Sequence, residues 1–536
     1  MKRLAVFLAL TLLFLCLAPA AAAADTAADT AALPVTFAVA SDLHYNEPDP
    51  ALTYFTEDPL FGHANRRAAL ENESGPIIDA FLADAAADDA VSFVLISGDL
   101  ADNGKTKPEE HYAVAEKLAR FERESGKEVY VINGNHDASL NPGDTSFDDF
   151  KAVYADFGYD RAVSRRGEDC SYTADPADGV RLIALDSCSK TKSTEDGMTL
   201  SKVIWVMREA AKAKREGREP ILMMHHNLLD HLPAQRIVSH DFIVRFHSLT
   251  ALLFSLSGVR VVLTGHEHCS DAAVKAVLPG RRIYDFATTS LTMYPLSYRR
   301  FTLSGDTLVY GAPAVSKIDT AAVAAATAGY TPEQLSLMDS DLAAYSLGYF
   351  KAGVKYRLAL GLSDEKLGIA PGEPFYGVAH TAAAGLLSAL DTPYAGEKGL
   401  AAGAARFGMA LPETDAETPW DLITTLAAAH YAGEEPYTPD SPEVRLLLKT
   451  AAFILRTVLP DTADASLFAA ANRLLSSDQT GLARRFAESA ASLAGDADPA
   501  GYLAAALLSP LLIEFGCDGD GVPDNAGRVV LQTGLF

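Results

Sequence analysis

Residues 93–104 combine an apolar run with a polar turn that holds two glycines and two aspartates: Phe93-Val94-Leu95-Ile96-Ser97-Gly98-Asp99-Leu100-Ala101-Asp102-Asn103-Gly104. The apolar part predicts a buried β-strand, and the polar part predicts a loop at its carboxyl end. The same pattern of an apolar run that ends in Asp, Asn or His occurs at four other places, namely Ser41-Asp42-Leu43-His44, Gly134-Asn135-His136-Asp137, Met224-His225-His226-Asn227 and Gly265-His266-Glu267-His268. Because ligands in α/β sheets gather beyond the carboxyl ends of strands, we expect the five clusters to converge on one site.

Strand-like and helix-like runs alternate over about residues 34–315. The runs that predict strands are 35–41, 92–97, 128–133, 180–187, 220–225, 259–265, 282–287 and 299–310. Amphipathic helices are predicted at 108–123 and 201–215. This alternation indicates an α/β layered domain. The later strands lack intervening helices, which favours a mixed sheet or a two-sheet sandwich over a purely parallel sheet.

The sequence changes in character after about residue 316, where it becomes rich in Ala and Leu. A capping oxygen followed by proline, which is typical of a helix start, recurs at Thr331-Pro332-Glu333, Thr418-Pro419-Trp420, Ser441-Pro442-Glu443 and Asp498-Pro499-Ala500. We therefore predict two domains, an α/β domain at 34–315 and a mostly helical domain at 320–536.

The N-terminus has the features of a secretory signal. Lys2 and Arg3 precede an apolar run that is followed by the small residues 20–24. A transmembrane anchor is the alternative, but it needs about 20 apolar residues. We expect residues 1–24 to be removed, leaving a secreted or extracytoplasmic protein without a transmembrane anchor. Four cysteines lie outside the signal and can form disulfides in an exported protein, namely Cys170, Cys188, Cys269 and Cys517. The sequence does not determine how they pair.

The chain is acidic, with a formal net charge of −25. Such a charge repels phosphate backbones and argues against wrapping by nucleic acid. However, six of the 13 histidines lie within the five clusters, in the same short segments as Asp, Asn or Gly. Each cluster alone is more often a solvated loop or a capped turn, but buried core histidines would not sort themselves in this way. Imidazole, carboxylate and carbonyl donors together suit zinc, manganese, iron or cobalt.

In chain order, the motifs D-x-H, G-D-x-x-D, G-N-H-D, a histidine after a strand, and G-H-x-H resemble the five motifs of the calcineurin-like metallophosphoesterases. The resemblance covers about residues 35–310 and implies a β-sandwich flanked by helices, with two metal ions (Mn, Fe or Zn, divalent or trivalent) at one edge. It implies that Asp99 bridges the ions and that His225, the first of two adjacent histidines, is the ligand of the fourth motif. One ion would be held by Asp42, His44 and His268, and the other by Asn135, His225 and His266.

The activity implied is hydrolysis of a small-molecule phosphate ester by a hydroxide held between the ions. His136, held by Asp102, would protonate the leaving group. Asp102 stands where the purple acid phosphatases have a tyrosine ligand, and Asn103 stands where the protein phosphatases have an arginine. The clusters contain no Arg or Lys. Arg66 and Arg67 follow the first cluster in a long loop, where we expect them to lie on the solvated surface. We therefore expect a phosphodiesterase.

Two alternatives stay open for the function. A phosphomonoesterase or nucleotide hydrolase would use the same ions on another ester. A cell-surface binding protein with a vestigial metal site is the more remote one, because every ligand position is filled. Separately, the spacing of Asp518, Asp520 and Asp524 resembles a calcium-binding loop, although position 5 lacks an acid, and an acidic turn is the default interpretation.

Overall fold

The computed structural model describes residues 33–49, 65, 67–192, 194–231, 235, 241–326, 329–361, 363, 376–433, 435, 437, 441–458 and 522–531. The predicted signal at 1–24, the predicted helix start at 498–500, and Arg66, Cys517, Asp518 and Asp520 lie outside these residues.

The first sheet is mixed and has six strands among the described residues. Its order is β13 (Ala526–Val530), β12 (Thr307–Gly311), β11 (Arg299–Ser304), β1 (Val35–Ala40), β2 (Val91–Ile96) and β3 (Glu128–Val131). Strands β1, β2 and β3 run parallel, so their carboxyl ends lie at one edge. The remaining pairs are antiparallel.

The second sheet is also mixed and has seven strands in the same part of the chain. Its order is β4 (Ser164–Arg165), β5 (Tyr172–Ala177), β6 (Val180–Leu185), β7 (Glu219–Met224), β8 (Val261–Thr264), β10 (Arg281–Ala287) and β9 (Asp271–Leu278). Strands β6, β7, β8 and β10 are parallel.

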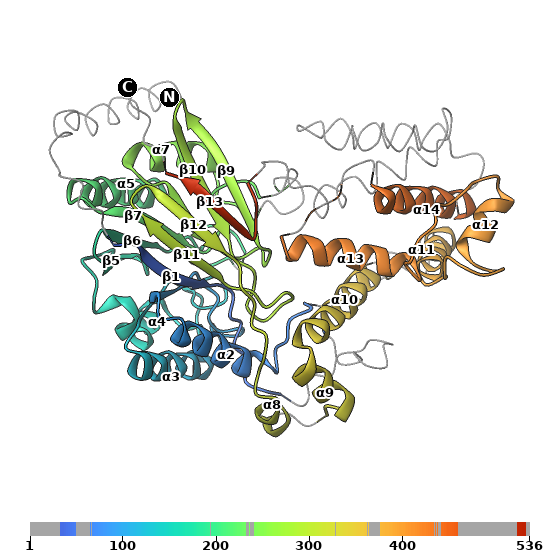
Figure 1. Ribbon diagram of the computed structural model, residues 1–536, viewed down its shortest axis with the longest axis horizontal. Helices are drawn as coiled ribbons and strands as arrows, with labels where there is room; N and C mark the ends of the chain where they lie inside the picture. Colours follow the sequence, from blue (N-terminus) through green and yellow to red (C-terminus); the bar gives the residue numbers. More distant parts are fainter. Residues whose placement is uncertain are drawn as a thin grey trace.

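The two sheets pack face to face and helices cover them (Figure 1). Phe301 of β11 and Phe286 of β10 meet edge to face across the interface, with ring centroids 5.1 Å apart. On the first sheet, α2 (Ser74–Ala87) and α3 (Pro108–Ser125) pack against β2 and β3. On the second, α5 (Leu200–Arg215) and α7 (His247–Ser257) take the same role, and α4 (Phe147–Val153) with the π-helical turn η1 (Ala155–Tyr159) lies beside α3 and β3. The predicted sandwich flanked by helices is thus confirmed.

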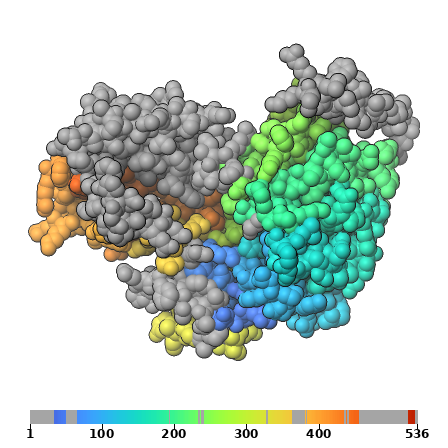
Figure 2. Space-filling view, turned by 180° about the vertical axis from the view of Figure 1, so that it is seen from behind, coloured from blue at the N-terminus to red at the C-terminus, as the bar shows by residue number. Residues whose placement is uncertain are grey.

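The second region is helical, as predicted, and lies to one side of the sheets (Figures 1 and 2). Its helices are α8 (Thr320–Ala326), α9 (Pro332–Ser340), α10 (Leu342–Gly361), α11 (Tyr376–Leu390), α12 (Leu400–Arg406), α13 (Pro419–Tyr431) and α14 (Pro442–Val458). Two of the predicted helix starts form complete capping boxes: Thr331 accepts from the Gln334 amide, and Thr418 accepts from the Asp421 amide.

The end of the chain departs from the predicted helical domain 320–536. Residues 526–530 form β13, which pairs antiparallel with β12 and extends the first sheet. Helical residues also share the core of the α/β domain, since Met338, Leu342 and Tyr345 are buried in the same apolar cluster as the sheet residues. The predicted boundary at 315–320 therefore separates two kinds of secondary structure but does not separate two cores.

Most predicted strands occur within a few residues of their expected bounds, with two kinds of exception. The run 299–310 is a hairpin, β11 and β12, because Gly305 adopts a left-handed turn conformation with φ of 59°. Strands β4, β5, β9 and β13 are additional to the predicted ones. In the described residues, Cys170, Cys188 and Cys269 are free thiols and buried.

None of the helices in the described ranges has the length and apolar character that crossing a membrane requires.

Candidate metal centre

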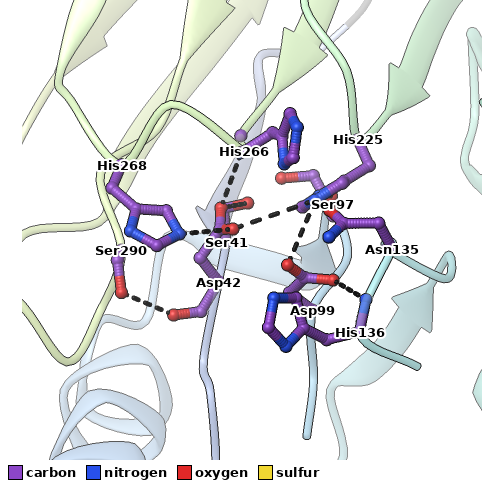
Figure 3. Close-up of polar contacts among 12 residues, drawn as sticks. Ser41, Asp42, Ser97, Asp99, Asn135, His136, His225, His266, His268 and Ser290 are labelled. Atoms are coloured by element: carbon purple, nitrogen blue, oxygen red, sulfur yellow. Dashed lines mark hydrogen bonds and ion pairs between the residues drawn. The ribbon is translucent and has the colours of Figure 1, made fainter. Parts of the chain in front are cut away.

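The five polar clusters meet at one edge of the sandwich, as the sequence predicts. Three follow β1, β2 and β3 of the first sheet, and two follow β7 and β8 of the second. The side chains from the two sheets point toward one another (Figure 3). The site therefore forms only when both sheets have packed together.

Backbone strain is concentrated at these strand ends. Five of the predicted ligand residues have a positive φ, namely Asp42 (50°), His44 (39°), Asp99 (49°), His266 (68°) and His268 (63°). Such conformations cost about 1–3 kcal/mol each in a residue other than glycine and persist where the surrounding structure imposes them. At these strand ends the side chains point toward the common centre (Figure 3).

Gly134 is required by close packing in the same place. A Cβ atom there would overlap the carboxylate and the main-chain nitrogen of Asp99. The glycine of the G-N-H-D motif thus lets the loop after β3 lie against the loop after β2.

The first group of converging side chains consists of Asp42, His44 and His268, whose donor atoms lie within 4.8 Å of one another. The Nε2 atoms of His44 and His268 are 3.1 Å apart. They lie 3.7 and 3.2 Å from Oδ1 of Asp42. The other oxygen of Asp42 accepts from the Ser41 hydroxyl at 2.5 Å and from the His266 amide at 2.9 Å, so that Oδ1 faces the histidines.

The second group consists of Asp99, His225 and His266, again within 4.8 Å. Nε2 of His225 lies 3.3 Å from Oδ2 of Asp99 and 2.9 Å from Oδ1 of Asn135. The same Oδ2 lies 3.8 Å from Nε2 of His44, in the first group. Asp99 therefore faces both groups, which is the position that a bridging carboxylate needs. That these atoms bind cations stays a prediction.

The outer nitrogens of the histidines are occupied in a way that favours metal binding. Nδ1 of His225 donates to the Ser97 carbonyl at 3.0 Å, and Nδ1 of His44 lies 3.1 Å from Oδ1 of Asp102. Nδ1 of His268 lies 3.1 Å from the sulfur of Met293. A ligating histidine usually donates its other N–H to such an acceptor, which directs the Nε2 lone pair inward.

Two buried polar atoms at the centre lack a hydrogen-bond partner, which indicates whether the predicted ligands suit cations. Among the described residues, Oδ1 of Asp42 and Nε2 of His266 have no such partner, although Asp42 is wholly buried and His266 is 6% exposed. Leaving a buried polar atom unsatisfied costs about 1–3 kcal/mol. Both atoms point into the centre, where a divalent cation would satisfy them, so the residues fit a metal centre.

The charges at the centre agree with this fit. Burial lowers the pKa of His44 to about 4 and holds the pKa of His266 well below its usual value, so both offer lone pairs at neutral pH. Burial raises the pKa of Asp42, but His268 and His225 outweigh it and lower the value to about 2. Burial lowers the pKa of His225, but Asp99 and Asp42 outweigh it and raise the pKa to about 9, so a cation bound there would displace a proton. The two buried carboxylates attract cations to the centre.

His226 lies behind the site, whereas Nε2 of His225 lies beside Asp99 and Asn135. The Ser187 hydroxyl lies 3.0 Å from Nδ1 of His226, and its Nε2 donates to the Thr194 carbonyl at 3.1 Å. Both ring nitrogens are thereby used, while the ring packs against His266 at 4.5 Å.

The predicted side-chain pair of His136 and Asp102 is absent. Nδ1 of His136 donates instead to the main-chain carbonyl of Asp102, at 2.7 Å. The carboxylate of Asp102 turns the other way and contacts His44 and Arg67. His136 itself lies beside the site, with its ring edge-on to His44 at 4.9 Å. Asp102 is therefore better described as a residue that positions His44.

Arg67 is a functional candidate that the sequence interpretation placed on the solvated surface. Its Nη1 donates to Oδ1 of Asp102, and its Nη2 lies 3.2 Å from Nδ1 of His44. Two adjacent arginines in a loop after the first cluster were the only signal for this position, because nothing local shows which way the loop folds.

The predicted calcium loop cannot be compared as a whole, because only Asp524 of its three acids is described. Oδ1 of Asp524 accepts from the Ala272 amide at 2.9 Å. Asp524 also lies with Asp271 and Glu435 in a group of three acids whose oxygens lie within 4.8 Å of one another.

Residues 35–270 match the family model described as calcineurin-like phosphoesterase. The comparison with curated proteins found no match.

Among solved structures, a dimetal phosphatase from Danio rerio is similar at 11% identity and a TM-score of 0.39, over 52% of this chain and 96% of that one. The NAD nucleotidase of Haemophilus influenzae is similar at 12% identity and a TM-score of 0.29, over 54% and 49%. The phosphopantetheinyl hydrolase of Mycobacterium tuberculosis is similar at 12% identity and a TM-score of 0.26, over 47% and 89%.

Proposed function

Because residues 35–270 form a calcineurin-like phosphoesterase domain, a fold that implies a dinuclear divalent metal centre, we propose that this protein hydrolyses a small-molecule phosphate ester at the site around Asp99. The observation that carries the proposal is the position of Asp99 between two groups of buried donors. Its Oδ2 lies 3.3 Å from Nε2 of His225 and 3.8 Å from Nε2 of His44.

Two cations at such a site would polarise the phosphoryl oxygens and lower the pKa of water, which supplies the nucleophile at neutral pH. The predicted ligands would be Asp42, His44 and His268 on one side, Asn135, His225 and His266 on the other, and Asp99 between them.

His136 is the proposed general acid. Its Nδ1–H is held by the Asp102 carbonyl, so the ring orientation is set by the main chain and Nε2 is left to exchange a proton with the leaving group. The main-chain N–H of His136 also donates to Oδ1 of Asp99 at 2.7 Å, which ties the acid to the bridging carboxylate.

Arg67 changes which substrate class is best supported. The sequence-based expectation of a phosphodiester rests on the absence of a cationic side chain from the clusters. With Arg67 in contact with both Asp102 and His44, that premise no longer holds. A phosphomonoester or nucleotide is then the better-supported alternative.

A substrate panel tests the proposed reaction. The purified protein would be loaded with Mn²⁺, Zn²⁺ or Fe²⁺ and assayed on aryl phosphomonoesters, aryl phosphodiesters and nucleotides, with Asp99→Ala as the inactive control. Hydrolysis that follows metal loading supports the proposal. Two bound ions with no hydrolysis of any ester would favour the binding protein with a vestigial site.

We also propose that the protein is exported. Lys2, Arg3 and the apolar run after them support this. Expression of the full chain with a C-terminal tag, followed by N-terminal sequencing of the extracytoplasmic fraction, tests it. A chain retained inside the cell with its N-terminus intact would refute export.

A further inference from the structure

Arg67 reaches the edge of the candidate metal centre from the loop that precedes α2. Its Nη1 donates to Oδ1 of Asp102, and its Nη2 lies 3.2 Å from Nδ1 of His44. The side chain is 32% exposed, so part of it is in contact with solvent. Within the described residues, no other arginine or lysine side chain makes a polar contact with a predicted metal ligand.

The guanidinium has more donors than its protein partners can use. It carries five N–H groups. If His44 offers Nε2 to a cation, its proton stays on Nδ1, which then donates to Asp102 at 3.1 Å and cannot accept from Arg67. Nη2 then has no acceptor on His44, and its N–H groups lie beside the outer edge of that ring, where they are available to a phosphoryl oxygen at the rim of the site.

Arg67 stays charged in this environment. A guanidinium is not deprotonated in proteins, and the carboxylates of Asp102 and Glu71 lie beside this one. The side chain therefore presents a fixed positive charge beside His44 and next to Asp102, whose main-chain carbonyl holds His136.

The turn that carries Arg67 is held by the buried side chain of Asn65. Oδ1 of Asn65 accepts from the amides of Arg67 (3.0 Å) and Ala69 (3.2 Å), and its Nδ2 donates to the Ala69 carbonyl (2.7 Å). The same Nδ2 donates to the hydroxyl of Tyr349 in α10, at 3.3 Å. One asparagine thus connects the arginine turn to the helical region.

Helix α10 lies directly against this turn. A Cβ atom at Gly353 would overlap the carbonyl of Asn65 and the main chain of Ala68, so the absence of a side chain there sets the closest approach. Apolar side chains from the turn and from the helical region pack together there in one buried cluster, made of Ala68, Ala69, Met293, Phe350, Val354, Ala427, Ala428 and Tyr431. Met293 in this cluster also contacts Nδ1 of His268 at 3.1 Å. The helical region therefore packs against two segments that border the site.

We propose that Arg67 binds the phosphoryl group of the substrate, that α10 positions it through Asn65 and Gly353, and that the site consequently prefers phosphomonoesters. This inference rests on the proposed function, since it names the substrate class of the same site. A monoester dianion carries one more negative charge than a diester and gains more from a forked cationic donor beside the cations.

The main test compares matched aryl monoester and diester substrates on one metal-loaded preparation. Wild type should favour the monoester by at least about tenfold in kcat/KM. Arg67→Ala should lower kcat/KM for the monoester by about 10²-fold, the usual effect of removing one preorganised donor, and for the diester by much less. Arg67→Lys should recover part of the monoester activity. Arg120→Ala, which removes an arginine paired with Asp79 on α2, is the matched control and should change neither rate.

Two further measurements separate binding from positioning. The number of bound ions should be the same in wild type and Arg67→Ala, whereas loss of ions would mean that Arg67 acts through Asp102 and His44, and would overturn the proposal. Inorganic phosphate should bind the metal-loaded wild type in calorimetry and bind Arg67→Ala at least about tenfold more weakly. An equal loss on both esters, or unchanged phosphate binding, would also overturn it.

The contribution of α10 is tested by Gly353→Ala and by the milder Tyr349→Phe. Each should shift the ratio of monoester to diester kcat/KM in the direction of Arg67→Ala, with bound ions retained. Gly361→Ala in the same helix is the control, because a Cβ atom there meets no other atom within 4 Å. An unchanged ratio in folded Gly353→Ala and Tyr349→Phe would refute the part assigned to α10. If wild type hydrolyses neither ester, the proposed function fails, and phosphate binding still decides the role of Arg67.

Discussion

Asp102 and His136 should have separable effects on the enzyme, because the structure gives them different partners. In Asp102→Asn, Nδ1 of His44 keeps only a neutral acceptor, while the bond from His136 to the carbonyl of residue 102 is unchanged. We expect weaker metal binding with a near-normal kcat once metal is in excess. In His136→Ala, we expect full metal content and a low kcat.

The magnitudes follow from the contacts. Loss of the group that orients a ligating histidine usually lowers metal affinity about 10–100-fold. That corresponds to about 1.4–2.8 kcal/mol. Loss of a general acid lowers turnover by roughly 10²–10⁴, and by less for esters with acidic leaving groups. Excess metal should restore the first variant and leave the second unchanged.

The assay titrates metal-free protein with Mn²⁺ and follows bound ions together with kcat on a series of aryl esters of graded leaving-group pKa. Asp306→Asn, which changes an exposed aspartate in the β11–β12 turn, is the control and should behave as wild type. The reasoning is refuted if Asp102→Asn keeps its ions and shows the leaving-group dependence of His136→Ala, because the carboxylate would then serve His136.

Three other perturbations test the rest of the structure. Asp99→Ala should bind fewer than two ions per chain and lose activity, since one carboxylate faces both donor groups; a variant with two ions by metal analysis would contradict this. Deleting residues 522–536 removes β13 and exposes the edge of β12. The Tm in a thermal melt should then fall by at least about 2–4 °C, which is the shift expected for each kcal/mol of stability lost in a domain of this size. An unchanged Tm would show that β13 does not contribute to stability. Burial lowers the pKa of His231, but Asp285 and Asp271 outweigh it and raise the pKa well above its usual value. The protonated histidine therefore stabilises the folded protein fully below about pH 6.5, and this contribution is lost as the pH rises through the folded pKa. The difference in Tm between wild type and His231→Gln should therefore be largest near pH 6 and shrink in alkaline buffer; a constant difference would argue against this charge.

Elements that depend on a local pattern of residues can be predicted from the sequence. Apolar runs that end in polar clusters identified the strands that border the site, because burial and strand periodicity are local properties. The helix starts at Thr331 and Thr418 were readable for the same reason, since a capping box is closed within four residues. The five clusters could be expected to converge, because the carboxyl ends of parallel strands share an edge.

The partner that each side chain takes depends on the packing of distant segments and is not predictable from the sequence. The carboxylate of Asp102 faces His44 and not His136, which depends on how the loop after β2 turns. Arg67 reaches the site because Asn65 and α10 hold its turn, and α10 comes from a region almost 300 residues later in the chain, as the contact of Asn65 with Tyr349 shows. Strand β13 joins a sheet whose other strands lie at least 200 residues earlier. Such contacts depend on packing between distant segments, and no local pattern of apolar and polar residues specifies them.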